Sequence, residues 1–353
     1  MHVTRFENNP IITPASIKPS RADFKVEGTF NAGVVDCDGQ TLMLLRVAES
    51  VRSDDPNEVR VPLMVQDAEG VTLTRRSFYR DDPTYDFSDP RTVVVKADRS
   101  RLFLTSMSHI RIARSGNGVD FSVDDVPFIQ PRHRCELFGC EDPRVVRIGD
   151  AYYINYSSVS DLGICTSLLR TRDFRHTEPL GIIFAPDNRD VCLFPEIIGG
   201  KYWALHRPAP AHFGAPGIWI SSSPDLLHWG GHHSLLEAST QGWDQRKVGG
   251  GAPMLRTEKG WLQVYHGVDQ AQRYCLGALL LKLDDPTQIV ARLPEPLMEP
   301  TAAYEREGFF GQVVFTCGAL IRDGSLHIYY GAADETMGLA TVPLNELWKR
   351  LGV

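Results

Sequence analysis

Two stretches of the sequence place carboxylates where acid–base chemistry could occur. Glu141-Asp142-Pro143-Arg144 sets two carboxylates and a cation side by side, and Glu196 directly follows Pro195 further along the chain. Carboxylates accept hydrogen bonds from hydroxyl groups, and Arg donates in a fixed fork. Two carboxylates together can also supply the acid and the base that cleavage of a glycosidic bond needs. These residue types therefore favour a sugar as the ligand.

Further polar and aromatic residues stand at the start of, or within, apolar strand-like runs: Asn31, Arg46, His206-Arg207, Tyr265-His266 and Asp334. A structural alternative exists for several of them. Asp142 before Pro143 is also typical of a turn, Glu196 could be a solvated turn carboxylate, and His206-Arg207 could be a structural pair. Because such residues recur at equivalent places of a repeated unit, the pattern favours a binding site.

The repeated unit is an apolar run, a turn rich in Gly and Asp, and a second apolar run that ends in aromatic residues, which is a hairpin signal. A Ser/Thr-x-Asp turn follows two copies, at Thr171–Asp173 and Ser223–Asp225. The turn glycines are Gly149, Gly200, Gly260 and Gly324. Their spacing is typical of propeller blades and predicts an all-β chain with five or six blades.

Helical periodicity is confined to the end of the chain, where residues 342–351 are expected to form a short helix. The Pro-rich opening, residues 1–28, is expected to lie as an extended arm on the body. We predict that residues 1–353 form one β-propeller domain. A propeller presents the first strand of each blade to a central channel, so the residues at the blade starts should converge on one funnel.

Composition narrows the function classes. The net charge of -7 and the pI near 5.9 provide no basic surface for nucleic acid. We see no export signal and no apolar stretch long enough to span a membrane. The seven cysteines lack a metal-ligand spacing, which favours free thiols in a reducing cytoplasm. We predict no metal and no organic cofactor, and a homo-oligomer is left open.

The ordered motifs resemble those of glycoside hydrolase family 130, whose members are five-bladed propeller enzymes acting on β-mannosides. The resemblance covers nearly the whole chain and rests on these segments: 9–11, 30–33, 44–46, 141–144, 193–196, 205–208, 249–253, 265–267, 304–308 and 330–334. It implies five blades rather than six.

The resemblance also implies roles for individual residues. Asp142 would be the general acid, acting through the 3-hydroxyl of the mannose rather than directly on the glycosidic oxygen, and the anomeric configuration would invert. The residues predicted to bind the substrate are Asn31, Arg46, Arg60, Arg144, His206, Arg207, Tyr265, His266 and Asp334.

The attacking group is the open question. Phosphorylases of the family carry a lysine after the Phe-Pro-Glu glutamate, and Ile197 stands there in this sequence. Loss of that cation removes a charge-assisted contact worth about 1.5–3 kcal/mol. The family's hydrolases use two glutamates to activate water, and Glu196 and Glu237 could fill these roles. We therefore predict an inverting, exo-acting β-1,2-mannosidase with Asp142, Glu196 and Glu237 as its catalytic residues.

Two alternatives stay open from the sequence. A β-1,2-mannobiose or β-1,2-oligomannan phosphorylase making mannose 1-phosphate would need inorganic phosphate, and Arg189, Lys201, Arg246 or Lys247 could rebuild a phosphate pocket from other loops. A non-catalytic sugar-binding propeller would keep its aromatic residues and lose the acid, whereas this chain keeps Asp142 and Glu196.

Overall fold

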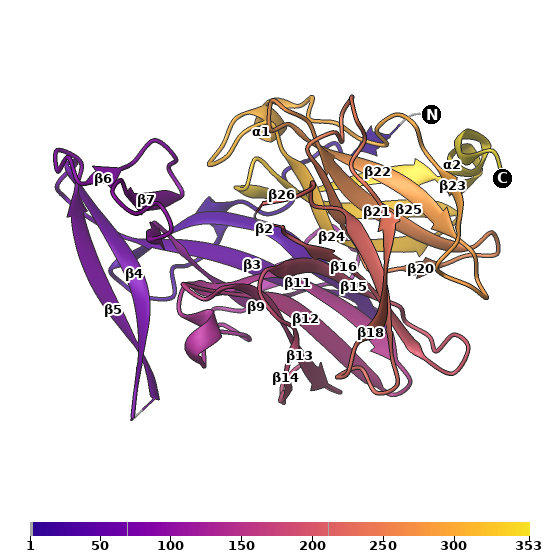
Figure 1. The fold of residues 1–353 in the computed structure, drawn as a ribbon, viewed down its shortest axis with the longest axis horizontal. Coiled ribbons are helices and arrows are strands. Elements are labelled where there is room, and N and C mark those ends of the chain that lie inside the picture. Colours follow the sequence, from indigo (N-terminus) through magenta and orange to yellow (C-terminus); the bar gives the residue numbers. More distant parts are fainter. Residues whose placement is uncertain (1–2, 69, 211) are drawn as a thin grey trace.

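The computed structural model describes residues 3–68, 70–210 and 212–353, and these are built almost entirely of β-strands (Figure 1). Their α-helices are α1 (Ala303–Arg306) and α2 (Leu344–Leu351), and their 3-10 turns are η1 (Pro14–Ser16) and η2 (Arg134–Glu136). The nearly all-β prediction is confirmed. The predicted terminal helix corresponds to α2, which ends before Gly352 in the left-handed conformation.

The largest sheet has eight strands. It contains β2 (Phe24–Cys37), β3 (Gln40–Val51), β9 (Met107–Ser115), β10 (Ser122–Val123), β11 (Gly139–Ile148), β12 (Ala151–Ser160), β13 (Gly163–Thr171) and β14 (Glu178–Phe184). Its two halves meet where β9 and β11 run parallel, with Gly139 paired to Ser108. The other pairings that join neighbouring strands of this sheet are antiparallel.

Three smaller sheets follow along the chain. One contains β15 (Asn188–Leu193), β16 (Tyr202–Pro208), β17 (Ile218–Ser223) and β18 (Gly230–Leu236). The next contains β19 (Lys247–Gly250), β20 (Leu255–Arg256), β21 (Trp261–Val268), β22 (Tyr274–Leu281) and β23 (Ile289–Arg292). The last joins β24 (Val314–Arg322), β25 (Ser325–Ala332) and β26 (Thr336–Pro343) to β1 (Thr4–Arg5), so strands from both ends of the chain share one sheet.

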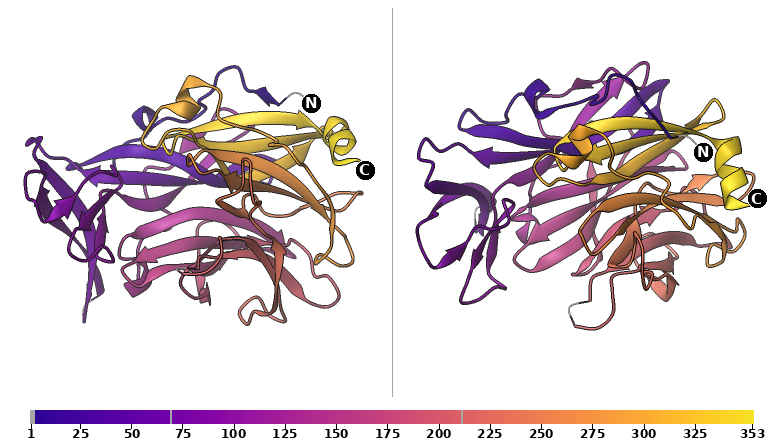
Figure 2. Two further views of the ribbon diagram at one scale, coloured as in Figure 1. Left: turned by 45° about the horizontal axis from the view of Figure 1, so that its top comes forward. Right: turned by 90° about the horizontal axis from the view of Figure 1, so that it is seen from above.

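Hydrophobic cores lie between neighbouring sheets. Leu262 and Leu280 pack with Ile328 of the last sheet. A further core lies between the two halves of the eight-stranded sheet, where Leu44 of β3 packs with Ile154 of β12. The first strands of the sheets contact one another, because β11 meets β2 and β15, while β15 also meets β19. This arrangement, seen from two further sides in Figure 2, brings the starts of separate sheets to a common centre.

The repeated turns have the local chemistry that the sequence predicts. In both Ser/Thr-x-Asp turns the Asp side chain accepts hydrogen bonds from two backbone amides that follow it and pairs with a His three residues later, in Asp173–His176 and Asp225–His228. Gly149 and Gly324 sit in the tight turns of β11–β12 and β24–β25 with positive φ, which favours glycine.

A separate insertion stands away from the main body (Figure 1). It consists of the hairpin β4 (Glu58–Asp67) and β5 (Gly70–Tyr79) and a small sheet of β6 (Tyr85–Asp86), β7 (Thr92–Val95) and β8 (Leu102–Leu104). Val61, Phe78 and Val93 form its own small core. Arg91, next to β7, reaches back toward the centre of the molecule, where its guanidinium lies 3.8 Å from the centroid of the Phe310 ring.

The search for membrane-spanning helices over the described residues found no helix of sufficient length and apolarity.

Candidate active site

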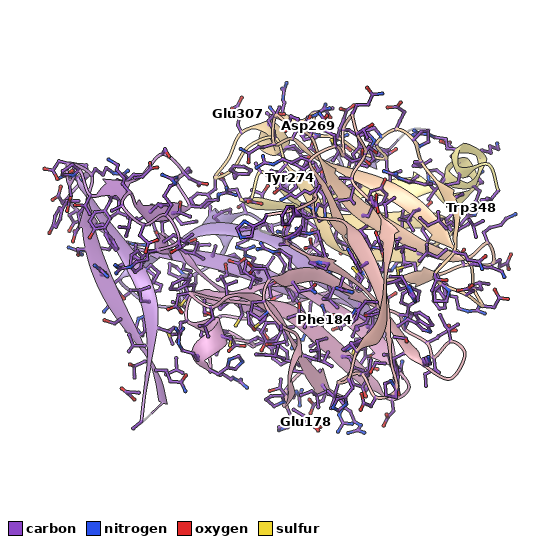
Figure 3. The ribbon with its side chains drawn as sticks, in the orientation of Figure 1. Glu178, Phe184, Asp269, Tyr274, Glu307 and Trp348 are labelled. Carbon is purple, nitrogen blue, oxygen red and sulfur yellow. The ribbon has the colours of Figure 1, made fainter. Side chains whose placement is uncertain are left out.

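A cavity of about 290 Å³ opens where the first strands of the sheets converge. Its polar lining consists of Asn31, Arg46, Arg91, Thr92, Ser106, Glu141, Asp142, Arg189, Asp190, Arg207, Lys247, His266, Tyr274 and Asp334. Phe30, Phe309, Phe310 and Phe315 add aromatic surface. Figure 3 labels Tyr274 near the middle of the molecule, in contrast to Glu178 at its outer margin. Charged and aromatic groups thus face one concavity, as a sugar site requires.

Three of these side chains are presented by the same backbone device. Asn31 in β2, Asp142 in β11 and Asp190 in β15 all have positive φ, at 52°, 49° and 56°, and each lies at a shift in strand register. A non-glycine residue with positive φ is uncommon, and a β-bulge redirects a side chain out of the regular alternation. The bulges therefore turn polar side chains of three strands, which belong to two sheets, into the cavity.

One wall of the cavity is acidic. The Oδ1 atom of Asp142 accepts a hydrogen bond from Asn31 Nδ2 at 3.0 Å and one from Arg46 Nη1 at 2.8 Å. Arg46 Nη2 pairs with Glu141 at 2.8 Å, and the Arg46 guanidinium lies over the Phe30 ring. Both hydrogen bonds to Asp142 end on Oδ1, and together they fix the orientation of its carboxyl group. Oδ2 is therefore the oxygen that can contact a ligand.

Burial changes the protonation of the two neighbouring carboxyl groups. It raises the pKa of Asp334 to about 6, although Arg46 and Arg91 act in the opposite direction. Burial likewise raises the pKa of Glu141 against the opposing effect of Arg46. Burial next to Arg46 therefore favours the protonated forms of Asp334 and Glu141 more than water does.

The opposite wall is cationic and comes from β15, β16 and β19. Burial, followed by the charge of Arg207, lowers the pKa of Arg189 below its ordinary value and that of Lys247 to about 7. Lys247 Nζ donates to Tyr274 Oη at 2.6 Å. The Nε atom of Arg189 is buried and has no hydrogen-bond partner among the residues that the structure describes. Crowded cations with unused donors are what a small anion would neutralise.

The structure brings together six of the predicted residues in the cavity lining: Asn31, Arg46, Asp142, Arg207, His266 and Asp334. Arg144 lies behind the lining, fully buried, where its Nε donates to Gly251 O at 2.6 Å. His206 is held by Asn188 and His232, and Tyr265 Oη accepts from Arg292 at 2.9 Å. These last three residues do not belong to the lining.

The remaining predicted residues also lie outside the cavity lining. Glu196 has a side chain that is 50% exposed and pairs with Arg256 at 3.2 Å. Glu237 is exposed on the segment after β18, with Ser234 as its neighbour. Arg60 pairs with Glu58 on the projecting hairpin. The placement of the two glutamates gives neither of them access to a ligand in this cavity.

The sequence analysis did not predict that Arg91, Asp190 and Tyr274 line the cavity. It named Arg189 and Lys247 only for the alternative of a phosphorylase. A signal for Asp190 was present. Arg189-Asp190 stands in β15 where Glu141-Asp142 stands in β11, each pair at the bulge of a first strand. The sequence instead predicts Glu196 as the second carboxylate position beside Glu141-Asp142. In the structure β15 ends at Leu193, so Glu196 lies beyond this strand and not at the bulge that Arg189-Asp190 occupies.

Comparison with known proteins identifies the class of enzyme. A family profile described as beta-1,4-mannooligosaccharide phosphorylase matches residues 90–351. The chain belongs to glycoside hydrolase family 130, which confirms the resemblance seen in its motifs.

Individual relatives are more specific than the family. A beta-1,2-mannobiose phosphorylase of Listeria innocua is 47% identical over 354 residues, covering 100% of this chain and 99% of the relative. A 1,2-beta-oligomannan phosphorylase of a Thermoanaerobacter species is 37% identical over 246 residues, covering 68% of this chain and 80% of the relative. The solved structure of the Listeria enzyme with beta-1,2-mannobiose superposes with a TM-score of 0.96 at 46% identity, covering 100% and 99% of the two chains.

These relatives overturn the prediction of a hydrolase. Both curated relatives are named phosphorylases, so the prediction of a glycosidase with two water-activating glutamates is wrong. The error came from treating Ile197 as the loss of the anion site. Ile197 is 54% exposed and lies outside the cavity lining, whereas Arg189, Arg207 and Lys247 line it from other strands.

Proposed function

We propose that this protein is an inverting phosphorylase that cleaves β-1,2-mannobiose with inorganic phosphate, giving α-mannose 1-phosphate and mannose. The observation that carries the proposal is the pairing, within one cavity, of an oriented acid with a cluster of cations. The names of the Listeria and Thermoanaerobacter relatives support the choice of disaccharide and nucleophile.

The cationic wall is the proposed phosphate site. Arg189, Arg207 and Lys247 all line the cavity, and Arg189 Nε is buried without a partner among the described residues. Phosphate offers several acceptor oxygens and about −1.5 to −2 charges at neutral pH, so it can satisfy two guanidinium groups and an ammonium at once. A water molecule carries no charge and would add nothing to offset the repulsion among these cations.

The acidic wall is the proposed site of proton transfer. Asp142, with Oδ1 held by Asn31 and Arg46, carries its proton on Oδ2 and passes it to the 3-hydroxyl of the mannose. That hydroxyl in turn protonates the glycosidic oxygen as the bond from C1 to this oxygen breaks. A phosphate oxygen attacks C1 from the opposite face, so the β-mannoside gives the α-configured phosphate ester. His266 and Asp334 line the same space and would contact the sugar.

Product analysis tests the proposal directly. The protein is incubated with β-1,2-mannobiose and inorganic phosphate, and the products are followed by proton and phosphorus NMR. We expect equal amounts of mannose and mannose 1-phosphate, with the ester present only as the α anomer because a glycosyl phosphate does not mutarotate. Formation of the β anomer, or of two mannose molecules without the ester, would refute the assignment.

We also infer a five-bladed propeller as the architecture, with residues 1–353 as one domain. Support comes from dividing the eight-stranded sheet at the parallel pair of β9 and β11, which leaves five units of about four strands each. The pairing of β1 with β26 would close such a ring. A cytoplasmic location stays a prediction from the sequence.

A further inference from the structure

Asp190 is a buried carboxylate in the middle of the proposed phosphate site. Its side chain lines the cavity, yet the residue is only 3% exposed and sits at the bulge of β15. A carboxylate would repel an incoming phosphate, so its presence among the cations needs a reason. The acid of the opposite wall is Asp142, which leaves Asp190 without a part in the proton transfer proposed above.

The contacts of Asp190 give that reason. Its Oδ2 accepts a hydrogen bond from Arg207 Nε at 2.5 Å, and Arg144 Nη2 lies 3.4 Å from its Oδ1. A guanidinium is planar and holds its five N–H groups in a fixed fork. Once Nε is held on one side, the directions of both Nη groups of Arg207 are set. Asp190 thereby determines which donors Arg207 can offer to an anion in the cavity.

Asp190 also moderates the charge of the cationic wall. Arg207 lowers the pKa of both Arg189 and Lys247, whereas Asp190 acts to raise both. Burial alone would raise the pKa of Asp190, but Arg207, His266 and Arg144 hold it below its ordinary value. The carboxylate is therefore ionised at neutral pH and offsets part of the repulsion among the cations when phosphate is absent.

A second buried residue connects this wall to the acid. Arg144 donates through Nη1 to the backbone oxygen of Asp142 at 3.2 Å and through Nη2 to Gly250 O at 3.1 Å. The same guanidinium faces Asp190, so the strands of Asp142 and Asp190 share one rigid link. The distance between the acid and the phosphate site is consequently fixed by buried groups rather than by loops.

We propose that Asp190 is a positioning residue of the phosphate site: it aims Arg207 at the anion and keeps the cations of the site together before the anion binds. This inference rests on the proposed phosphorylase function. Asp190 donates no proton and acts through Arg207, with Arg144 joining it to the strand that carries the acid.

The test compares Asp190→Asn with the wild-type enzyme by steady-state kinetics, varying phosphate and disaccharide separately. Loss of the charge weakens a charge-assisted contact, so we expect the KM for phosphate to rise at least about tenfold while the KM for the disaccharide stays within about twofold. Asp124→Asn is the matched control, because it removes an Arg-paired carboxylate on the surface. It should behave as wild type.

The pH profile gives a second readout that a merely structural role would not change. Lys247 is faced by Arg189 and Asp190 of β15, Arg207 of β16, His266 of β21, Tyr274 of β22 and the adjacent Arg246. Among these, Asp190 is the carboxylate that favours the charged ammonium. In Asp190→Asn the pH above which the KM for phosphate begins to rise should therefore move to lower values.

Arg207→Lys provides an independent variant in case Asp190→Asn does not fold. It keeps the charge but removes the fork, so we again expect the KM for phosphate to rise at least about tenfold. A phosphate-dependent wild-type enzyme together with unchanged phosphate KM in the folded variants would overturn the role of Asp190. A wild-type enzyme that needs no phosphate would instead overturn the proposed function, and the inference with it.

Discussion

Each of the two walls of the cavity presents side chains from a β-bulge, but one wall is acidic and the other is cationic. In β11 a bulge presents Glu141-Asp142, and in β15 a bulge presents Arg189-Asp190. In the first strand the aspartate is oriented by Asn31 and Arg46 and keeps one oxygen for a ligand. In the second, the aspartate is occupied by Arg207. Neighbouring residues, rather than the aspartate itself, decide whether the position serves as an acid or as a counter-ion.

The largest expected effect removes the acid from its wall. Asp142→Asn keeps the size of the side chain but cannot supply the proton, so kcat should fall by at least about 10³-fold. Binding of β-1,2-mannobiose, measured by isothermal titration calorimetry, should stay within about fivefold because an amide still accepts and donates hydrogen bonds. Turnover within about tenfold of wild type would remove Asp142 as the acid.

The next effect removes a cation from the opposite wall. Arg189→Met leaves the apolar stem but deletes a buried donor, and the KM for phosphate should rise about ten- to a hundredfold, with a smaller change in the KM for the disaccharide. Steady-state kinetics with each substrate varied will separate the two constants. Arg175→Met, at an exposed arginine of the β13–β14 turn, is the control and should leave both constants as in wild type.

A smaller effect follows from pH. Because the pKa of Lys247 is lowered to about 7, this residue is an ammonium below that pH and a neutral amine above it. Phosphate binding should therefore weaken as the pH rises from about 6 to about 8.5. In Lys247→Arg the cation persists throughout this range. Dividing the phosphate KM of the wild type by that of Lys247→Arg at each pH therefore removes the effect of the titration of phosphate itself. A ratio that does not change with pH would contradict the assignment.

The smallest effect concerns the position that misled the sequence analysis. Ile197→Lys restores the lysine typical of phosphorylases in the family, but at an exposed place outside the cavity lining. We expect kcat/KM for phosphate to change by no more than about twofold, as for most surface substitutions. A gain of tenfold or more would mean that position 197 reaches the phosphate and that the two walls are incomplete as described.

Much of the scaffold could be predicted because its signals are local. Gly149 and Gly324 mark tight turns, and Asp173 and Asp225 cap repeated turns through their own backbone neighbours. The place of Asp142 in the cavity lining could be predicted because it stands in a distinctive motif.

The proposed phosphate site could not be predicted in the same way. Arg189, Arg207 and Lys247 come from three strands that meet only in the folded chain, and each is unremarkable in its own segment. Glu196 was expected in the site, yet it lies outside the cavity lining, because the sequence does not reveal that β15 ends at Leu193. In the folded chain β15 runs from Asn188 to Leu193 and presents Arg189 and Asp190 to the cavity, before the chain reaches Glu196.

The dependence of the initial rate on phosphate concentration tests the central claim most directly. With β-1,2-mannobiose at saturation, mannose release should fall to zero as phosphate is removed and rise hyperbolically as it is added, because the attacking group is the phosphate that the cationic wall is proposed to bind. Release of mannose at an undiminished rate in the absence of phosphate would contradict the account.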